Sequence, residues 1–464
     1  MIHNRQVILL LLVLAQITAS AQDGMSVFAS TPASAQDGMA VFAPTPTAAQ
    51  DGMSVFAPTP TAAQDGANSL LNADLPVDTL SKAQKRAFRF SGQVSTWGQL
   101  TPDIDRSLWV GGRIIPQLNL ELPFANDKNK IDFEASANIY GNCGINPFSE
   151  FDTDGKIKPY RVWARYSTAW MEFRTGLQKI NFGSAQMLRP LMWFDKMDPR
   201  DPLQMTDGVW GGLFRYYFKN NANIWLWGLM MNKDTKGLEI ISTAGDIRPE
   251  AGGRVQVPIK NGELALSYHT RRVDLWNYLL PVAHPSSADG NPLSSNNLWS
   301  NPQPQPAKLT GEHRLGFDVR ADVVVGLWFE TAWTLLTDDI FFKNQLMATL
   351  GADYTIGIGN GLGITLEHML YSIGLKTFDF QTNVNFTAVN FTYPVSLAGN
   401  ANAILYYDWK NNGFYSFAGF NYQIENVTLY LMAYLNPKTN TLPMQSSVER
   451  FTGKGIQLMA VWNF

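Results

Sequence analysis

Several features common in soluble proteins are scarce in this chain. Of its 464 residues, 16% are charged, below the usual quarter, and the net charge is -3. This near-neutral balance argues against a nucleic-acid-binding protein. No internal run of twenty apolar residues occurs, so we expect no membrane-spanning helix. The single cysteine, Cys143, cannot form an internal disulfide, so an exported chain needs another source of stability.

The first residues have the pattern of a secretory signal. Arg5 precedes an apolar core at 7–14, and Ala19-Ser20-Ala21 forms a small-residue cleavage site. We therefore expect a signal peptide at 1–21 and a mature chain that begins at Gln22. No cysteine lies at the junction, so we do not expect lipoprotein processing.

Residues 22–66 form a tandem repeat. The sequence A-Q-D-G recurs at Ala21, Ala35, Ala49 and Ala63. One apolar cluster per repeat is too little for a core, and the Pro-Thr-Pro segments favour polyproline II, so we expect a disordered periplasmic region. A simple spacer and a short-motif ligand for a periplasmic partner are both compatible with it. Residues 67–87 are expected to be a linker or a short helix.

From Phe88 onward, apolar and polar residues alternate in segments of strand length. We count about 18 such segments, an even number, as in bacterial barrels. In residues 314–320, for example, apolar side chains alternate with Arg314, Asp318 and Arg320. A soluble sandwich would turn the apolar face inward, whereas a membrane barrel turns it to lipid. We predict an all-β fold, a transmembrane antiparallel β-barrel of about 18 strands over 88–464.

The lengths of the connections distinguish these two folds. Even-numbered connections are tight turns, at 220–222, 260–262 and 359–361, with type I′ or bulged hairpin chemistry. Odd-numbered connections are longer, at 142–156, 181–209, 233–249, 273–310 and 437–452. Long outer loops and short periplasmic turns alternate in outer-membrane barrels, whereas a sandwich has no reason to keep this order.

The last dozen residues, 453–464, also alternate. Ile456, Leu458 and Trp462 fall on one face, and the segment ends in Phe464. An apolar strand cannot be left as a bare edge in water, so in a barrel it pairs with the first strand. An alternating last strand that ends in Phe resembles the closing strand of bacterial outer-membrane barrels. That resemblance implies recognition by the barrel-assembly machinery and contact with outer-membrane lipid; an ordinary edge strand is the alternative.

Residues 181–209 form the most distinctive loop. It is long, and its apolar segment at 187–194 would be unfavourable on a solvated surface. On a wide barrel, such a loop is expected to pack back into the lumen as a constriction, although capping of the barrel rim is an alternative. The charged residues expected at the constriction are Arg189, Asp195, Lys196, Asp198, Arg200, Asp201 and Asp207.

Part of this region resembles a known family. Residues 174–183, R-T-G-L-Q-K-I-N-F-G, followed by D-P-R-D at 198–201, resemble the R-x-G-x-Q-x-I-x-W-G…N-P-x-D segment of alginate-export-type and related porin-like outer-membrane barrels. Phe182 stands in place of the usual Trp, and Asp198 in place of the usual Asn. The resemblance implies an 18-stranded pore, in the outer membrane of a Gram-negative bacterium, that passes anionic polysaccharide or small solutes.

Strand periodicity predicts a mixture of charges on the inner wall. The predicted pore-lining residues are Arg161, Arg165, Glu172, Arg174, Arg215, Arg254, Arg271, Glu312, Arg314, Asp318 and Arg320. Arginines would suit an anionic polymer, but acidic residues share their face, so alginate itself is not supported. Two interpretations stay open: a structural ladder that holds the wall rigid, and a path for anions.

Other chemistry has little support in the sequence. Glu150, Asp152 and Asp154 begin like a calcium loop, but Arg161 stands where the closing Glu belongs. The histidines lack metal-ligand spacing, so we expect neither a metal nor a cofactor. His269 and His313 lie on adjacent expected strands, as in an outer-membrane lipid hydrolase, but no serine partner stands out. We therefore do not expect an enzyme.

These patterns together predict a porin-like outer-membrane channel with its N-terminal repeats in the periplasm. Polar or anionic solutes, polysaccharide among them, would pass by diffusion past the constriction loop. The alternative is a plugged outer-membrane barrel that binds or anchors surface polysaccharide, for which the long loops at 273–310 and 437–452 are the motivation.

Overall fold

The computed structural model describes residues 88–102, 108–124, 129–145, 152–197, 200–232, 234–239, 247–275, 309–338, 340, 343–376, 383–437, 451 and 453–464. The predictions of a signal peptide, a repeat region and a linker lie outside the described residues, as do those for Asp198 and Glu150. Within the described ranges, no helix has the length and apolar character needed to cross a membrane.

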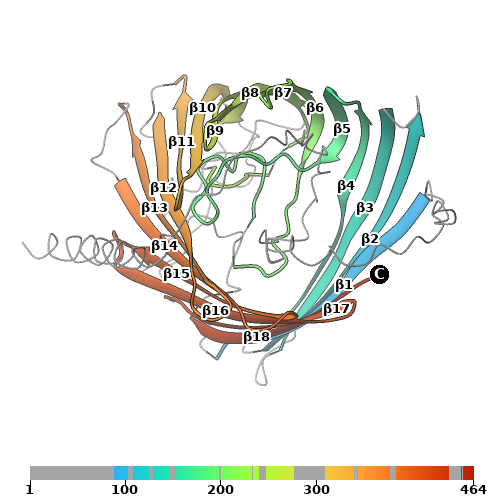
Figure 1. Ribbon diagram of the computed structural model, residues 1–464, viewed down its shortest axis with the longest axis vertical. Helices are drawn as coiled ribbons and strands as arrows, with labels where there is room; N and C mark the ends of the chain where they lie inside the picture. Colours follow the sequence, from blue (N-terminus) through green and yellow to red (C-terminus); the bar gives the residue numbers. More distant parts are fainter. Residues whose placement is uncertain are drawn as a thin grey trace, which may run out of the picture. The chain divides into compact units, whose positions relative to one another are not determined.

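Eighteen strands make up a single sheet (Figure 1). The first nine are β1 (Phe88–Leu100), β2 (Leu108–Phe124), β3 (Asn129–Ile145), β4 (Asp152–Ser167), β5 (Met171–Gln178), β6 (Val209–Tyr217), β7 (Asn223–Leu229), β8 (Glu250–Ile259) and β9 (Gly262–Asp274). The others are β10 (Leu309–Asp322), β11 (Gly326–Leu336), β12 (Asn344–Ile356), β13 (Leu362–Gly374), β14 (Asn383–Pro394), β15 (Gly399–Asp408), β16 (Gly413–Ile424), β17 (Val427–Leu435) and β18 (Lys454–Asn463).

The sheet closes on itself. Each strand pairs in antiparallel fashion with the next one in the chain, and β1 also pairs with β18 over Gln93 to Leu100. Two backbone hydrogen bonds extend this seam, from Gly92 N to Phe464 O at 2.9 Å and from Phe464 N to Gly92 O at 3.0 Å. Closure satisfies the backbone groups that an open edge would leave unpaired. The prediction of a closed antiparallel barrel of 18 strands is confirmed.

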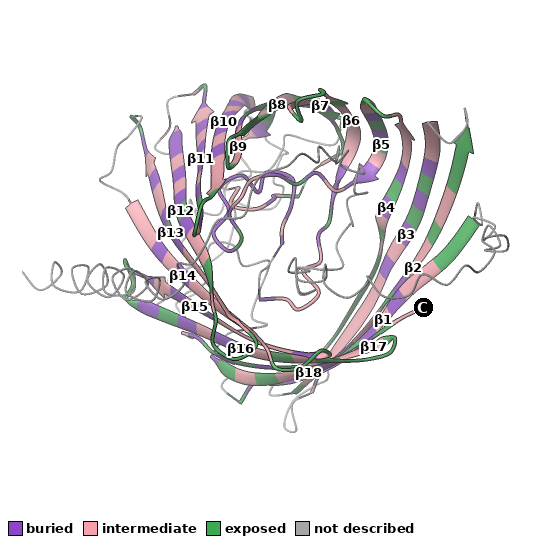
Figure 2. Cartoon of the chain, viewed as in Figure 1, coloured by how far each residue is buried: buried purple, intermediate pink, exposed green. Residues whose placement is uncertain are grey.

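The two faces of the sheet differ as the alternation predicts. On β10, Arg314 and Asp318 are buried, whereas Leu315 between them is 42% exposed. The same alternation is visible as stripes along most strands (Figure 2). The residues on the buried side contact loops inside the barrel, so this side is the inner face. The outer face is mainly apolar, as a surface that contacts lipid must be.

The connections follow the expected order, with one correction. Asn221, Gly359 and Gly361 adopt the positive φ values of 64°, 57° and 98° that tight hairpins require. The loop expected at 142–156 is too long, because Ile145 ends β3 and Asp152 begins β4. The register pairs 141 with 155 and 142 with 154, so the candidate calcium segment from residue 152 onward is paired strand.

Candidate functional site

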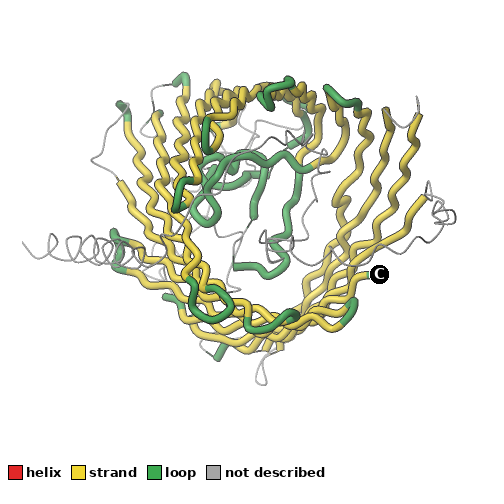
Figure 3. Tube along the Cα trace, viewed as in Figure 1, coloured by secondary structure: helices red, strands yellow, loops and turns green. Residues whose placement is uncertain are grey.

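The segment between β5 and β6, residues 179–208, lies inside the barrel (Figure 3). We call it the inner loop. Its apolar side chains are almost fully buried, with Leu188, Leu191 and Trp193 exposed by 3% or less. They pack in two clusters with residues of β6, β7 and β11–β17, including Met347 and Met369. The inner loop therefore leaves one wall and packs against another.

A carboxyl group on β13 binds the backbone of the inner loop. Glu367 accepts hydrogen bonds from the N–H groups of Gln186 at 2.6 Å, Met187 at 2.9 Å and Leu188 at 2.6 Å. Thr349 on β12 donates to the carbonyl of Leu188 at 2.8 Å. A segment without secondary structure leaves its backbone groups unpaired, and here strand side chains satisfy them.

A second carboxyl group, on β11, acts in the same way. Glu330 accepts hydrogen bonds from Ala185 N at 2.9 Å and Leu191 N at 2.6 Å. Gly183 has a φ of 94°, and a Cβ placed on it would lie 2.5 Å from the carboxylate oxygen of Glu330. The close approach therefore requires a residue without a side chain. The sequence analysis did not identify Glu330 as a site residue. The alternation of residues along β11 nevertheless places its side chain on the inner face.

Arginines hold the base of the inner loop. Arg161 on β4 donates to Thr206 O at 3.2 Å and to Thr206 Oγ1 at 2.6 Å. Arg189 bonds within the loop, to Asn181 and to the carbonyl of Phe182. Both guanidinium groups thus stabilise a fold of the backbone, so neither is a free cation directed at a solute.

The far end of the inner loop reaches β16–β18. The guanidinium group of Arg200 lies 5.3 Å from the ring centroid of Phe417 and 5.5 Å from that of Phe451, within the range of cation–π attraction. Leu203 packs against the cluster of Trp97, Met459 and Val461. Asp201 accepts from Leu203 N at 3.0 Å and so stabilises the local turn.

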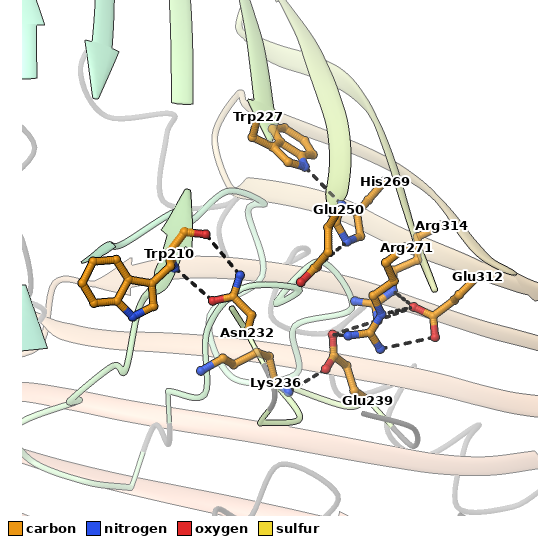
Figure 4. Close-up of polar contacts among 10 residues, drawn as sticks. All are labelled: Trp210, Trp227, Asn232, Lys236, Glu239, Glu250, His269, Arg271, Glu312 and Arg314. Atoms are coloured by element: carbon orange, nitrogen blue, oxygen red, sulfur yellow. Dashed lines mark hydrogen bonds and ion pairs between the residues drawn. The ribbon is translucent and has the colours of Figure 1, made fainter. Parts of the chain in front are cut away.

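The connection between β7 and β8 supports the inner loop. Gly237 donates its N–H to Asp195 O at 2.7 Å, and Lys236 N donates to Glu239 at 2.7 Å. Glu239 in turn forms ion pairs with Arg271 at 3.0 Å and Arg314 at 2.7 Å (Figure 4). The two loops and the wall at β9–β10 are therefore one connected polar network.

Ion pairs line the inner face of β8, β9 and β10. Glu312 binds both Arg271, at 2.7 Å, and Arg314, at 2.5 Å. Arg254 binds Asp318 through two bonds, at 2.5 and 2.9 Å. These groups are nearly inaccessible to solvent. Each buried charge would therefore destabilise the fold if its oppositely charged partner were removed.

A second group of charges lies on β3–β6. Arg165 binds Asp132 at 2.7 Å, and Glu172 lies 3.1 Å from Arg174 and 3.8 Å from Arg215. Arg215 also lies over the ring of Trp225 at 3.9 Å. The last predicted pore-lining residue, Arg320, pairs with Asp322 and Asp353 and is 29% exposed. All eleven predicted residues thus lie on the inner face, and their role in solute passage stays a prediction.

Among the residues predicted for the constriction, Asp195 has an unusual environment. Burial raises the pKa of its carboxyl group above the ordinary value, and the charges of Arg189 and Lys179 only partly oppose this effect. Among the described residues, its carboxyl group accepts one hydrogen bond, from Lys196 N at 2.7 Å. Asp207 differs, because its hydrogen bond and ion pair with Lys158 outweigh burial and lower its pKa.

The two histidines considered for lipid hydrolysis lie on opposite faces of the sheet. His269 is buried on the inner face, where Trp227 donates to its Nδ1 at 3.1 Å and Glu250 contacts its Nε2 at 3.2 Å. His313 contacts Tyr268 OH at 2.8 Å on the outer face. The pair therefore does not form one site. Within the described residues, no cluster of three metal-type ligands occurs.

A closed sheet with an apolar exterior, a charged interior and a loop packed inside defines the outer-membrane type of β-barrel. OccD3 (OpdP) of Pseudomonas aeruginosa shares the fold, with 10% identity, a TM-score of 0.51, and coverage of 82% of this chain and 91% of that one. Two other structures are less similar. OccAB1 of Acinetobacter baumannii has 8% identity and a TM-score of 0.46, with coverage of 81% of this chain and 96% of that one. Wzi of Escherichia coli, an outer membrane protein involved in group 1 capsule assembly, has 12% identity and a TM-score of 0.43, with coverage of 82% of this chain and 84% of that one.

No protein-family model and no curated protein matches the chain. The resemblance to alginate-export-type barrels is therefore unconfirmed. The similarity to OccD3 supports the porin-like barrel fold alone.

Proposed function

We propose that the protein is a porin-like channel of the Gram-negative outer membrane, through which polar or anionic solutes, polysaccharide among them, diffuse passively. The observation that carries the proposal is the docking of the inner loop across the barrel. Glu330 and Glu367 bind its backbone from β11 and β13, so the loop has a defined position beside the wall. A loop in a defined position can set the width of a pore.

The outer surface supports a location in the membrane. Leu350 and Leu458 on the outer face are 63% and 61% exposed, and many other apolar side chains accompany them. A surface so apolar would be unstable in water but suits outer-membrane lipid. The closing strand β18, with Phe464 after it, remains the proposed signal for the barrel-assembly machinery, and the N-terminal repeats would lie in the periplasm.

The inner wall supports passage without chemistry. Its charges are mostly paired with each other, so the wall presents polar groups of both signs rather than a single reactive group. Such a wall attracts hydrated solutes while binding none of them tightly. A non-enzymatic role fits this arrangement, and anion preference would come from Arg165, Arg174 and Arg215, which share the acceptors Asp132 and Glu172.

The test is the conductance of the refolded mature chain in a planar bilayer, compared with a variant that lacks residues 188–204. We expect steady current in the native protein and a larger current in the variant, because the deletion removes most of the inner loop. Folding of both proteins is checked by the mobility shift of heated and unheated samples. Silence in both folded proteins would refute a channel function.

A plugged barrel that binds surface polysaccharide is the second candidate. It is favoured by the packing of two connections inside one barrel, since Gly237 of the β7–β8 connection bonds to Asp195 of the inner loop. A native protein that is silent but conducts after the deletion would support this candidate over the open channel.

A further inference from the structure

The inner wall has two chemically different parts. Charged residues are frequent on β3–β13, but the described strands β14–β18 contain only two, Asp408 and Lys454, each at a strand end. Their inner-face positions instead hold amides, aromatic rings and apolar or small side chains. We call this part the amide wall. A solute beside it meets hydrogen-bonding groups that carry no net charge.

Three amides and a tyrosine are adjacent on the amide wall. Asn400 on β15 is in register with Asn421 on β16, and Asn421 is in register with Tyr430 on β17. Two residues along β15, on the same face, Asn402 is opposite Gly419. A Cβ on Gly419 would lie 2.3 Å from the amide oxygen of Asn402. The glycine thus leaves room for the Asn402 side chain to lie flat along the wall.

These amides are available to a ligand. All three asparagines are half-buried. Among the residues that the structure describes, no hydrogen bond to the side chains of Asn400, Asn402 or Asn421 is present, in contrast to the paired charges of the opposite wall. Each amide can both donate and accept, so the group offers up to two donors and one acceptor oxygen per residue.

The end of the inner loop faces the amide wall and forms a recess with it. The recess has a volume of only about 30 Å³, so a ligand larger than a few water molecules lies along it rather than inside it. Its lining includes Arg200 and Pro202 from the loop and Asn402, Ile404, Phe417, Asn421, Tyr430 and Met432 from the wall. Arg200 lies over Phe417 and Phe451. The wall therefore contributes amide, aromatic and aliphatic side chains, and none of them is charged.

This chemistry matches a neutral sugar. Sugar hydroxyl groups both donate and accept hydrogen bonds, as amides do, and the apolar faces of sugar rings pack on aromatic side chains. An anionic chain would instead need several cations, whereas Arg200 is the one cation of this lining and its guanidinium group lies over Phe417 and Phe451. We infer that the amide wall and the end of the inner loop form a binding track for a neutral oligosaccharide. The inference rests on the proposed function, because the track lies along the path that solutes would take.

The test measures block of the channel by maltohexaose, with an oligogalacturonate of equal length as the anionic comparison. We expect maltohexaose to interrupt the native current at a concentration at least tenfold lower than the anionic sugar. Asn402→Leu combined with Asn421→Leu should raise the blocking concentration at least tenfold. Gln117→Leu combined with Asn119→Leu is the matched control, because it removes two amides from the inner face of β2 and should leave block unchanged.

Binding is also measured without current, by titration calorimetry of maltohexaose into the detergent-folded protein. A conducting protein that maltohexaose neither blocks nor binds would overturn the inference and leave the channel function intact. Stronger block by the anionic sugar would overturn it as well. A silent protein that binds maltohexaose, with loss in the Asn402→Leu/Asn421→Leu variant, would support the track while refuting the channel.

Discussion

The side chain of Glu367 and the backbone N–H of Leu188 are joined by a hydrogen bond of 2.6 Å across 179 positions of sequence. One residue belongs to a strand of the wall, and the other belongs to the inner loop. Because the bond connects elements that share no local sequence, it reports directly on whether the loop is docked. Substitutions of either residue should therefore change the single-channel current more than they change the stability of the barrel.

Replacement of Glu367 by Ala should loosen the inner loop. The change removes the acceptor for three backbone N–H groups, and a buried donor left without a partner costs about 1–3 kcal/mol. We expect larger and noisier single-channel current from a barrel that still folds. Glu263→Ala is the control, because Glu263 bonds to Gln256 on the neighbouring strand β8. Equal conductance in the two variants would argue against docking through Glu367.

Replacement of Gly183 by Ala should have a related effect for a different reason. The new Cβ would lie 2.5 Å from the Glu330 carboxylate, at a φ of 94° that costs a residue with a side chain about 1–3 kcal/mol. We expect increased current noise, similar to that of Glu330→Ala. Gly98→Ala is the control, since a Cβ there meets nothing within 4 Å. Native noise in Gly183→Ala would show that the turn is not under this constraint.

Replacement of Glu312 by Gln should destabilise the barrel itself. The change removes one of the two carboxylates, Glu312 and Glu239, that Arg271 and Arg314 share, and loss of one member of a buried ion pair costs about 3–5 kcal/mol. The urea concentration at the unfolding midpoint, measured in micelles, should fall. Arg320→Gln removes a charge from a group that is 29% exposed, so its cost should be about 0–1 kcal/mol. Similar midpoints for the two variants would contradict this account.

The stability of the inner loop should depend on pH through Asp195. Burial raises the pKa of this carboxyl group, so the folded protein holds a proton at pH values where the unfolded chain has released it. The stabilising contribution of protonation is therefore present below the unfolded pKa and is lost as pH rises through the folded pKa. Current noise should therefore increase as the pH is raised above the ordinary titration range of a carboxyl group, and Asp195→Asn should reduce this change. An unchanged pH profile in the variant would exclude Asp195 as its source.

The sequence carries enough information to predict the strands and their faces. Alternation around Leu315 places apolar groups toward lipid, and short turns such as the one containing Asn221 need residues that tolerate positive φ. These signals are local, within a few residues. The loop expected at 142–156 is shorter in the structure, because Gly141 pairs with Gly155 and the strands β3 and β4 continue past this pair.

The contacts of the inner loop could not be predicted in the same way. Apolar content indicated that the loop would be buried, but Glu330 and Glu367 are recognised as its partners only when β11 and β13 are placed in the barrel. The ion pair between Arg254 and Asp318 also could not be predicted from the sequence, because the two residues lie on β8 and β10, which are separated by β9 in the sheet. Such contacts follow from the closed geometry rather than from spacing.

The seam between β1 and β18 has a consequence for the order of folding. The side chains of Gln93 and Asn463 are joined by a hydrogen bond of 3.1 Å across 370 positions of sequence. All the other strand pairs of the sheet join strands that are consecutive in the chain. Any intermediate with fewer strands therefore has two open edges, each able to pair with another copy of the chain. Contacts of such long range also form slowly. Productive folding thus depends on a surface that protects both edges until β18 meets β1.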